Sequence, residues 1–275
     1  MDARTMAQIA VSATPCGAGA GPGSRMIKGH DAIRQAYRDE TVAREYVDTR
    51  FREPLGALLH ARQVAAIRRL IGEKRPSRVL EIAPGPGRLT VDVSKGIDGF
   101  VMMPVLVEAS AQMLSEARRR LARTSLRWRT LQGDAFSLPF ANAFDLVYVF
   151  RLIRHFRSTE RTLLYRQIAK VLRPGGTLVF DAINEIVSAP LRAYAPGEYQ
   201  HYDALMRPDV LEMELAESEL ELVSLEGVQR RYPALARIQT LVAPRSRQMA
   251  RLAIELVDRF GGGAPLEWIV TCRRR

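Results

Sequence analysis

The stretch Val79-Leu-Glu-Ile-Ala-Pro-Gly-Pro-Gly-Arg-Leu-Thr90 decides how the chain is organised. Its first residues, 78–82, form an apolar run typical of a buried strand, and a helical pattern begins after Gly87. Gly85 and Gly87 lie between the two, and a residue without Cβ allows a tight turn and close approach of a ligand. The helix that follows would direct its unpaired N–H groups at that ligand. The stretch therefore predicts a nucleotide-type binding turn at the end of a strand.

An acidic residue supports this interpretation. Glu108 ends a second apolar run, Pro104-Val-Leu-Val-Glu108, about 20 residues after Gly87, which is the spacing of the ribose-binding acid in a Rossmann-like unit. Thr90 stands where the third glycine of a dinucleotide fingerprint would fall. The turn and this acid therefore predict a nucleotide-like ligand, with a nicotinamide cofactor as an open alternative.

Bulk properties narrow the class of protein. The chain has 275 residues, of which 47% are hydrophobic, and this is enough for an α/β domain with a full core. It lacks an apolar run of about 18 residues, so we expect neither a membrane-spanning helix nor a membrane partner. The two cysteines, Cys16 and Cys272, form no disulfide framework and no metal-ligand cluster. We therefore expect no metal and a cytoplasmic location.

The formal net charge of +11 comes almost entirely from arginine. Basic proteins can bind nucleic acid, but these arginines are scattered along the sequence rather than interleaved with aromatic residues in one stripe. A solvated basic surface is the favoured interpretation, and a nucleic-acid partner remains the less favoured alternative.

The N-terminal part differs from the rest. Residues 1–27 are rich in Gly, Ala, Pro and Ser and predict a disordered tail. Residues 28–56 suggest short helices, broken at Pro54, that would form a lid. From residue 57 an amphipathic helix opens the main domain, which we place at 57–275, and Gly72 and Pro76 are expected to end that helix.

Strands and helices then alternate, which predicts a doubly wound parallel sheet with right-handed crossovers. Segments 189–207, expected as a loop, and 229–263 interrupt the alternation. We expect both segments to cover a substrate pocket. Segment 229–263 could instead form a dimer contact. The expected strands are 78–82, 104–108, 126–131, 144–150, 177–182, 220–228 and 266–272.

Four motifs in this order resemble those of class I S-adenosylmethionine-dependent methyltransferases of the small-molecule, type 11 kind. They occupy residues 79–87, 106–110, 133–140 and 172–178. The resemblance implies an α/β, Rossmann-like sheet of seven strands in the order 3-2-1-4-5-7-6, the last strand antiparallel, with helices on both faces. It also implies S-adenosyl-L-methionine as the cofactor.

The resemblance carries over to particular residues. The turn after the first strand would face the methionine part of the cofactor, Glu108 the ribose, and Asp134 the adenine amino group. Alternatives stay open: Glu81 and Glu108 could each interact with a helix dipole or form a surface pair, and Asp134 could cap its own turn. The implied cofactor-binding residues are Glu81, Ala83, Gly85, Gly87, Glu108, Ala109, Gly133, Asp134, Ala135 and Phe150.

Transfer to a hydroxyl or amine also needs a proton acceptor. His155, in Phe150-Arg-Leu-Ile-Arg-His-Phe156 after the fourth strand, is the candidate base, with a packing or capping role as an equal alternative. Arg151 and Arg154 could steer an anionic acceptor or brace the loop. Tyr46, with Arg50 on the same helix face, is the candidate lid residue.

The predicted function is methyl transfer from S-adenosyl-L-methionine to oxygen, nitrogen or carbon of a small-molecule acceptor, with a homodimer as an open option. Two alternatives remain: an RNA methyltransferase and a non-catalytic S-adenosylmethionine-binding protein. Against the RNA alternative, an Asn-Pro-Pro-Tyr-type motif does not follow the fourth strand, where Phe150-Arg-Leu-Ile stands instead.

Overall fold

The structure, a computed structural model, describes residues 51–96, 103–198 and 202–275. The predicted tail at 1–27 lies outside these residues, as does most of the predicted lid at 28–56, including Tyr46 and Arg50.

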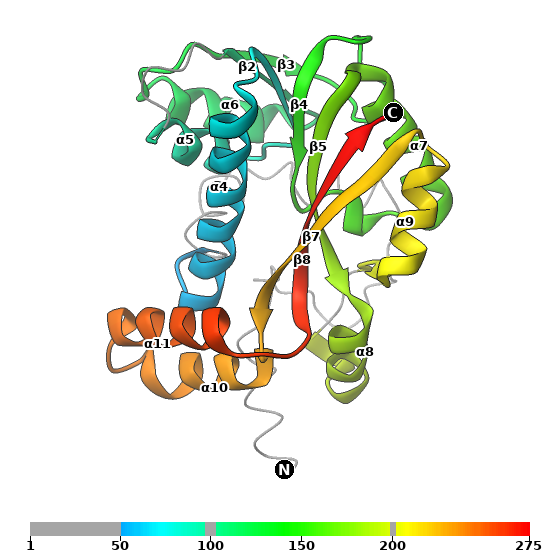
Figure 1. Ribbon diagram of the computed structural model, residues 1–275. Coiled ribbons are helices and arrows are strands. Elements are labelled where there is room, and N and C mark those ends of the chain that lie inside the picture. The colour runs from blue at the N-terminus through cyan, green and yellow to red at the C-terminus, as the bar shows by residue number, and fades with distance from the viewer. Residues whose placement is uncertain (1–50, 97–102, 199–201) are drawn as a thin grey trace, which may run out of the picture.

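A twisted sheet forms the centre of the molecule, with its main strands in the order β3-β2-β1-β4-β5-β8-β7 (Figure 1). The predicted order is confirmed, because β7 and β8 are the expected sixth and seventh strands. The strand β8 runs antiparallel to both of its neighbours, β5 and β7, and the other pairings among the described strands are parallel. The strands are β1 (Arg78–Ile82), β2 (Met103–Glu108), β3 (Arg129–Gln132), β4 (Phe144–Val149), β5 (Leu172–Asn184), β6 (Leu205–Met206), β7 (Leu220–Arg230) and β8 (Pro265–Arg274).

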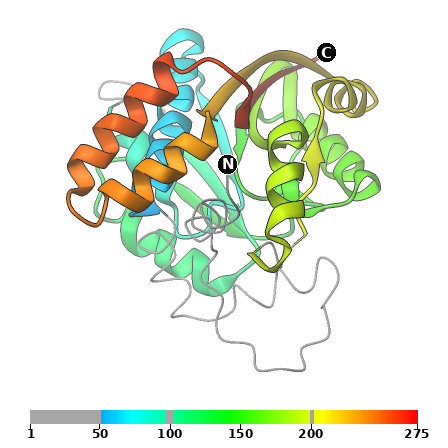
Figure 2. The same cartoon turned by 90° about the horizontal axis from the view of Figure 1, so that it is seen from below.

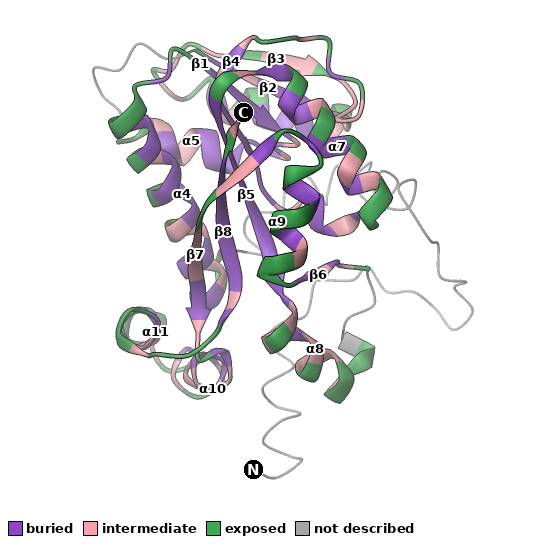
Figure 3. Ribbon diagram, turned by 45° about the vertical axis from the view of Figure 1, so that its right-hand side comes forward, coloured by how far each residue is buried: buried purple, intermediate pink, exposed green. Residues whose placement is uncertain are grey.

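Helices cover both faces of the sheet, as predicted. The helices α4 and α5 pack on one face and α7 and α9 on the other, while β5 and β8 between them are buried along most of their length (Figure 3). The helices are α4 (Pro54–Lys74), α5 (Arg88–Ser94), α6 (Ala111–Leu121), α7 (Ser158–Val171), α8 (Glu185–Tyr194), α9 (Pro208–Ala216), α10 (Tyr232–Val242) and α11 (Arg247–Phe260), with short 3-10 turns η2 (Ile153–His155) and η3 (Pro196–Glu198).

Two prolines belong to helices. Pro54 was expected to end the helical segment before it, and the helical residue Phe51 is indeed followed by a break at residues 52–53. The proline itself opens α4, because the first helical turn needs no N–H donor there. That helix also continues through Gly72 and ends at Arg75, whose backbone is left-handed (φ 45°). Pro190 lies inside α8, so the segment expected as a loop at 189–207 begins within a helix. Asn184 starts that helix by accepting a hydrogen bond from the Ile186 N–H at 3.1 Å.

Other departures are local. The third strand begins at Arg129 rather than at residue 126. The two-residue strand β6 pairs with the end of β5 and was not predicted. The insertion at 229–263 contains α10 as well as the expected α11. The apolar side of α10, including Leu235 and Ala236, packs with Leu58 of α4 and Ile254 of α11.

The topology brings the carboxyl ends of the parallel strands to one edge of the sheet. Because β7 is antiparallel to β8, and β8 to β5, β7 runs in the same direction as β1, β2, β4 and β5. Their carboxyl ends therefore share an edge, which Figure 2 views from below. The helix α8 follows β5 on one side of this edge, and α10 and α11 follow β7 on the other. Ligands of open α/β sheets bind at such an edge.

Candidate active site

The turn after β1 has an unusual backbone. Ala83, Gly85 and Gly87 all have positive φ angles, of 50°, 56° and 72°. A Cβ on Gly87 would lie 3.2 Å from the Ala117 Cβ of α6, so this glycine allows close helix packing. A Cβ on Gly85 would meet no atom within 4 Å. The turn therefore leaves open space at Gly85, where a ligand can approach the backbone.

Ala83 is the one residue of this turn whose side chain conflicts with its backbone. A left-handed conformation costs an L-residue roughly 1–2 kcal/mol, and glycine avoids most of this cost. We expect Ala83→Gly to raise the free energy of unfolding by about 0.5–1 kcal/mol in denaturant titration, after the higher chain entropy of glycine is subtracted. The matched control is Ala122→Gly, where the backbone is right-handed (φ −59°) and the change should destabilise. A loss of stability in Ala83→Gly would contradict the proposed strain.

The carboxylate of Glu108 is tied to this turn. Its Oε2 accepts the Gly85 N–H at 3.0 Å, and its Oε1 accepts the Ser110 N–H at 2.9 Å. Burial raises the pKa of Glu108, while these N–H groups and that of Ala109 oppose the shift. An ionised carboxylate has about four acceptor positions, so it can still accept from vicinal hydroxyls. The ends of β1 and β2 thus form one binding unit.

The loop after β3 lies beside this unit. The Gly133 N–H donates to the Glu108 carbonyl at 3.0 Å, which joins the ends of β2 and β3. Oδ1 of Asp134 accepts the Phe136 N–H at 3.1 Å, so this side chain caps its own turn. Ala135 packs at the margin of the main apolar cluster. The structure therefore shows the capping role of Asp134, and its contact with adenine stays a prediction.

Glu81 lies beneath the turn rather than on its surface. It is only 2% exposed, and its carboxylate accepts a hydrogen bond from Thr90, whose hydroxyl lies 2.5 Å from that of Tyr148. Burial raises the pKa of Glu81 to about 7, against opposing contributions from Thr90 and Arg88. Glu81 therefore supports the turn from below, and a direct contact with the methionine group stays a prediction.

This buried acid should make stability depend on pH. The unfolded carboxyl loses its proton near pH 4.5, whereas folded Glu81 keeps it until about pH 7. Between these values the unfolded state binds fewer protons, so stability should fall as pH rises and then level off. The raised pKa of Glu81 should lower the free energy of unfolding by about 3 kcal/mol across this pH range. Denaturant titration from pH 4.5 to 8 should show a smaller decline for Glu81→Gln than for the unsubstituted protein.

The control for this prediction is Glu255→Gln, because Glu255 is on the exposed side of α11. It should reproduce the decline of the unsubstituted protein. If Glu81→Gln declines equally, Glu81 is not the group that retains its proton on folding.

A second buried network was not predicted. Arg88 donates to Nδ1 of His60 at 2.5 Å and to Oε1 of Gln63 at 2.7 Å, and it lies 3.9 Å from the Phe51 ring centroid. Because Nδ1 of His60 accepts, its Nε2 carries the hydrogen and donates to Asp92 at 2.6 Å. The hydrogen bond from His60 lowers the pKa of Asp92 well below its usual range. The network joins α4 to α5, the helix that begins at the binding turn.

The end of β4 contributes the next residues. Phe150 is buried in the apolar cluster beneath α4. Arg151 has a left-handed backbone (φ 62°), and its N–H donates to Oδ1 of Asp181 at 2.6 Å. This strained turn directs the chain across the carboxyl edge, between β4 and β5. It sets the positions of Arg154 and His155.

Arg154 has a bracing role. It is 3% exposed and lies 2.7 Å from Oε1 of Glu267 on β8 and 3.5 Å from Oδ2 of Asp181 on β5. Burial alone would lower its pKa, but these carboxylates raise it well above the usual range. Of the two roles considered for Arg154, the structure supports the bracing of the loop, because two acids already neutralise its charge.

His155 lies in η2 beside an acid that the sequence did not reveal. Its Nδ1 is 3.1 Å from Oδ1 of Asp203 and 3.3 Å from the Tyr202 carbonyl. Both neighbours are acceptors, so Nδ1 carries the hydrogen and Nε2 of the neutral ring can accept a proton. Burial disfavours ionisation of Asp203, but His155, Arg154 and Arg192 outweigh it and hold its pKa well below the usual range.

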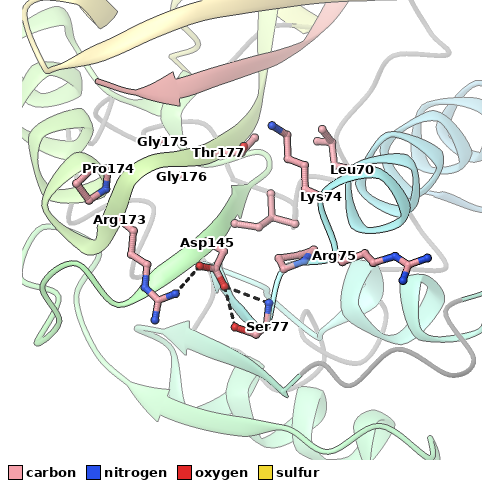
Figure 4. A pocket seen from close by; sticks show the side chains of 12 residues that line it. Leu70, Lys74, Arg75, Ser77, Asp145, Arg173, Pro174, Gly175, Gly176 and Thr177 are labelled. Carbon is pink, nitrogen blue, oxygen red and sulfur yellow. Dashed lines mark hydrogen bonds and ion pairs between the residues drawn. The ribbon is translucent and has the colours of Figure 1, made fainter.

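A pocket of about 490 Å³ lies at the opposite edge of the sheet, where β1, β4 and β5 begin (Figure 4). Asp145 at its centre accepts from the Ser77 N–H and hydroxyl at 3.0 Å and from Arg173 at 2.8 Å. These bonds tie the starts of three strands together. Because binding in this fold occurs at the carboxyl edge, we assign this pocket a structural role. In the described ranges, the structure shows no group of three or more His, Cys, Asp or Glu that could hold a metal ion.

Comparisons with known proteins agree with the fold. Residues 79–176 match the family described as "Methyltransferase domain". The chain is 36% identical over 108 residues to a demethylmenaquinone methyltransferase of Thermus thermophilus, covering 39% of this chain and 47% of that protein. It is 28% identical to a malonyl-[acyl-carrier protein] O-methyltransferase of Methylococcus capsulatus, covering 68% and 72%. The chain spans about half the length of the first of these relatives.

Solved structures show the same fold. The magnesium protoporphyrin IX methyltransferase of Synechocystis with bound SAH superposes with a TM-score of 0.63 at 10% identity, covering 90% of this chain and 100% of that one. The N-methyltransferase NodS of Bradyrhizobium japonicum gives 0.56 at 17% identity, covering 89% and 97%. Residues 79–176 thus match a methyltransferase domain, and the chain has the fold of the class I, S-adenosylmethionine-dependent methyltransferases, as its four motifs predicted.

The residues at the carboxyl edge fit the cofactor of this class. Gly85 has open space where a Cβ would project, and the buried Glu108 carboxylate retains acceptor capacity beside it. The backbone at Gly85, which carries no side chain, suits close approach of a methionine group. The Glu108 carboxylate suits the two hydroxyls of a ribose.

Proposed function

We propose that this chain transfers the methyl group of S-adenosyl-L-methionine to a small-molecule acceptor at the carboxyl edge of the sheet. The observation that carries this proposal is the hydrogen bond between the Gly85 N–H and the Glu108 carboxylate, which makes the binding turn and the ribose acid one unit. The relative named as a demethylmenaquinone methyltransferase supports a small-molecule acceptor, and the relative named as an O-methyltransferase supports oxygen as one candidate atom. Oxygen, nitrogen and carbon all remain candidates for the methylated atom.

The cofactor supplies a methyl group already activated on a sulfonium, so the protein mainly positions the reactants and excludes water. Glu108 with Ala109 would hold the ribose, and the backbone at Ala83, Gly85 and Gly87 would approach the methionine group. We propose Gly133, Asp134 and Ala135 for adenine, and Phe150 for the floor beneath the reacting centre.

His155 is the proposed base. Its Nε2 would take the proton from the acceptor, while Asp203 acts as a positioning residue that keeps the hydrogen on Nδ1. We propose that Arg151 contacts the acceptor. It lies two residues before η2, which begins at Ile153.

Segments around this edge would enclose the acceptor. The helices α8, α10 and α11 flank it, and we propose that they cover the acceptor, with Tyr46 and residues 28–56 as a lid. A cytoplasmic place of action belongs to the same proposal, because Cys272 is a free, buried thiol.

Calorimetric titration of the full chain with S-adenosylmethionine and with its demethylated product tests the proposal. Both should bind, and a cell extract supplied with labelled methyl donor should show label in small molecules. A folded protein that binds neither ligand would contradict the proposal. Label in RNA would support the RNA alternative, and binding without transfer to any acceptor pool would support a non-catalytic role.

A further inference from the structure

The helix α11 has an exposed apolar side that no described element covers. Ala250, Ile254 and Asp258 form its buried side, toward α4, α10 and β7. Met249, Leu252, Leu256 and Phe260, at helical spacing, are each 60–73% exposed. We call these four residues the α11 stripe. None of the helices in the described part of the chain has the length and apolar character needed to cross a bilayer.

The insertion that carries this stripe has an excess of positive charge. Residues 229–263 contain seven arginines but only two acidic residues, Glu255 and Asp258. Asp258 is buried and already paired with Arg62 at 3.2 Å. Among the described residues, Arg247 is the only one of the seven arginines that pairs with a carboxylate, Glu53 at 3.1 Å. The insertion therefore presents an apolar side within a largely unneutralised cationic surface.

This positive charge helps to decide which partner could cover the α11 stripe, a second copy of the chain or an anionic surface. A second copy meeting the stripe symmetrically would bring its own arginines against these, which disfavours a homodimer through this surface. An anionic surface has the complementary charge. Leucine and phenylalanine on one side of a helix, with arginines such as Arg251 and Arg259 on its exposed polar side, are the pattern of helices that lie in a membrane interface.

We propose that α11 binds to the surface of an anionic lipid bilayer, with the α11 stripe in the interface and the surrounding arginines at the lipid headgroups. This partner differs from the expectation of no membrane partner, which rested on the lack of a long apolar run in the sequence. The helix follows the carboxyl end of β7, so this contact would place the acceptor edge close to the bilayer. The inference does not depend on methyl transfer, since it rests on the exposure and charge of α11.

Sedimentation of the full chain with vesicles tests the proposal. The protein should bind vesicles of phosphatidylcholine with phosphatidylglycerol and should bind vesicles of phosphatidylcholine alone much more weakly. Leu252→Gln combined with Leu256→Gln should weaken binding on the order of 100-fold, because two exposed side chains no longer enter the apolar phase. Arg251→Gln and Arg259→Gln should each weaken it roughly fivefold and reduce its dependence on salt.

Leu163→Gln is the matched control, because Leu163 on α7 is exposed to a similar extent but lies outside the insertion. It should bind as the unsubstituted protein does. The proposal is overturned if the full chain ignores anionic vesicles, if both vesicle types bind equally, or if the leucine pair has no effect. It is also overturned if that pair instead abolishes a dimer seen by light scattering without lipid, since the stripe would then bind a second copy.

Discussion

Replacing Glu108 with alanine is expected to weaken binding of S-adenosylmethionine on the order of 100-fold or more, since hydrogen bonds to a charged group contribute about 1.5–3 kcal/mol each. The substitution removes the acceptor for the ribose hydroxyls. It also releases the Gly85 and Ser110 N–H groups that now fix the turn against β2. Calorimetric titration measures the affinity, and circular dichroism with a thermal melt confirms that the variant is folded.

Two further variants make this result specific. Glu108→Gln keeps the shape but places an amide N–H₂ against one of the two backbone donors, so it should also lose affinity, about tenfold. Glu221→Ala removes an exposed carboxylate from β7, paired with Arg273, and should bind the cofactor as the unsubstituted protein does. If folded Glu108→Ala binds normally, Glu108 is not the ribose acid and the proposed site is wrong.

Replacing His155 with alanine is expected to lower turnover about 10²- to 10⁴-fold with little change in cofactor affinity. The imidazole is proposed to act on the acceptor, so its loss should appear in kcat rather than in cofactor binding. Asp203→Asn tests the positioning role separately. Its amide N–H₂ can turn toward Nδ1 of His155, which would move the ring hydrogen to Nε2 and remove the accepting nitrogen.

Asp203 also forms an ion pair with Arg192 at 2.8 Å. The effect of losing this ion pair must therefore be separated from the effect on His155. Arg192→Gln removes the ion pair but leaves the Asp203 carboxylate beside His155, and it should retain most of the turnover. Asp203→Asn should instead lower kcat, because the accepting nitrogen of His155 is lost. If His155→Ala turns over normally, the ring only holds residues 202–203 against η2.

The seven main strands could be predicted because each has its own apolar run, and their order followed from the resemblance of the four motifs to those of class I methyltransferases. These signals are local. The errors arise where a distant contact decides the structure. The apolar side of α10 is satisfied only by packing against α4 and α11. Pro190 lies inside α8, whose start is set six residues earlier by the Asn184 cap rather than by the proline.

The candidate site likewise has a part that local sequence signals predict and a part that depends on distant contacts. The turn, Glu108 and the loop at Gly133 meet at one edge because parallel strands bring their carboxyl ends together. The pairing of His155 with Asp203 could not be predicted, because the two residues lie far apart in sequence and in segments without a regular pattern. The neutralisation of Arg154 likewise needs Glu267, which arrives on the last strand.

The position of β8 has a consequence for how the protein folds during synthesis. This strand comes last in the described chain yet lies inside the sheet, between β5 and β7. While β8 is still in the ribosome, the β1–β5 half can already assemble the proposed cofactor site, but one edge of β5 and both edges of β7 lack partners. Unpaired edges of this kind are prone to aggregate. The nascent chain should therefore need a chaperone most just before β8 emerges.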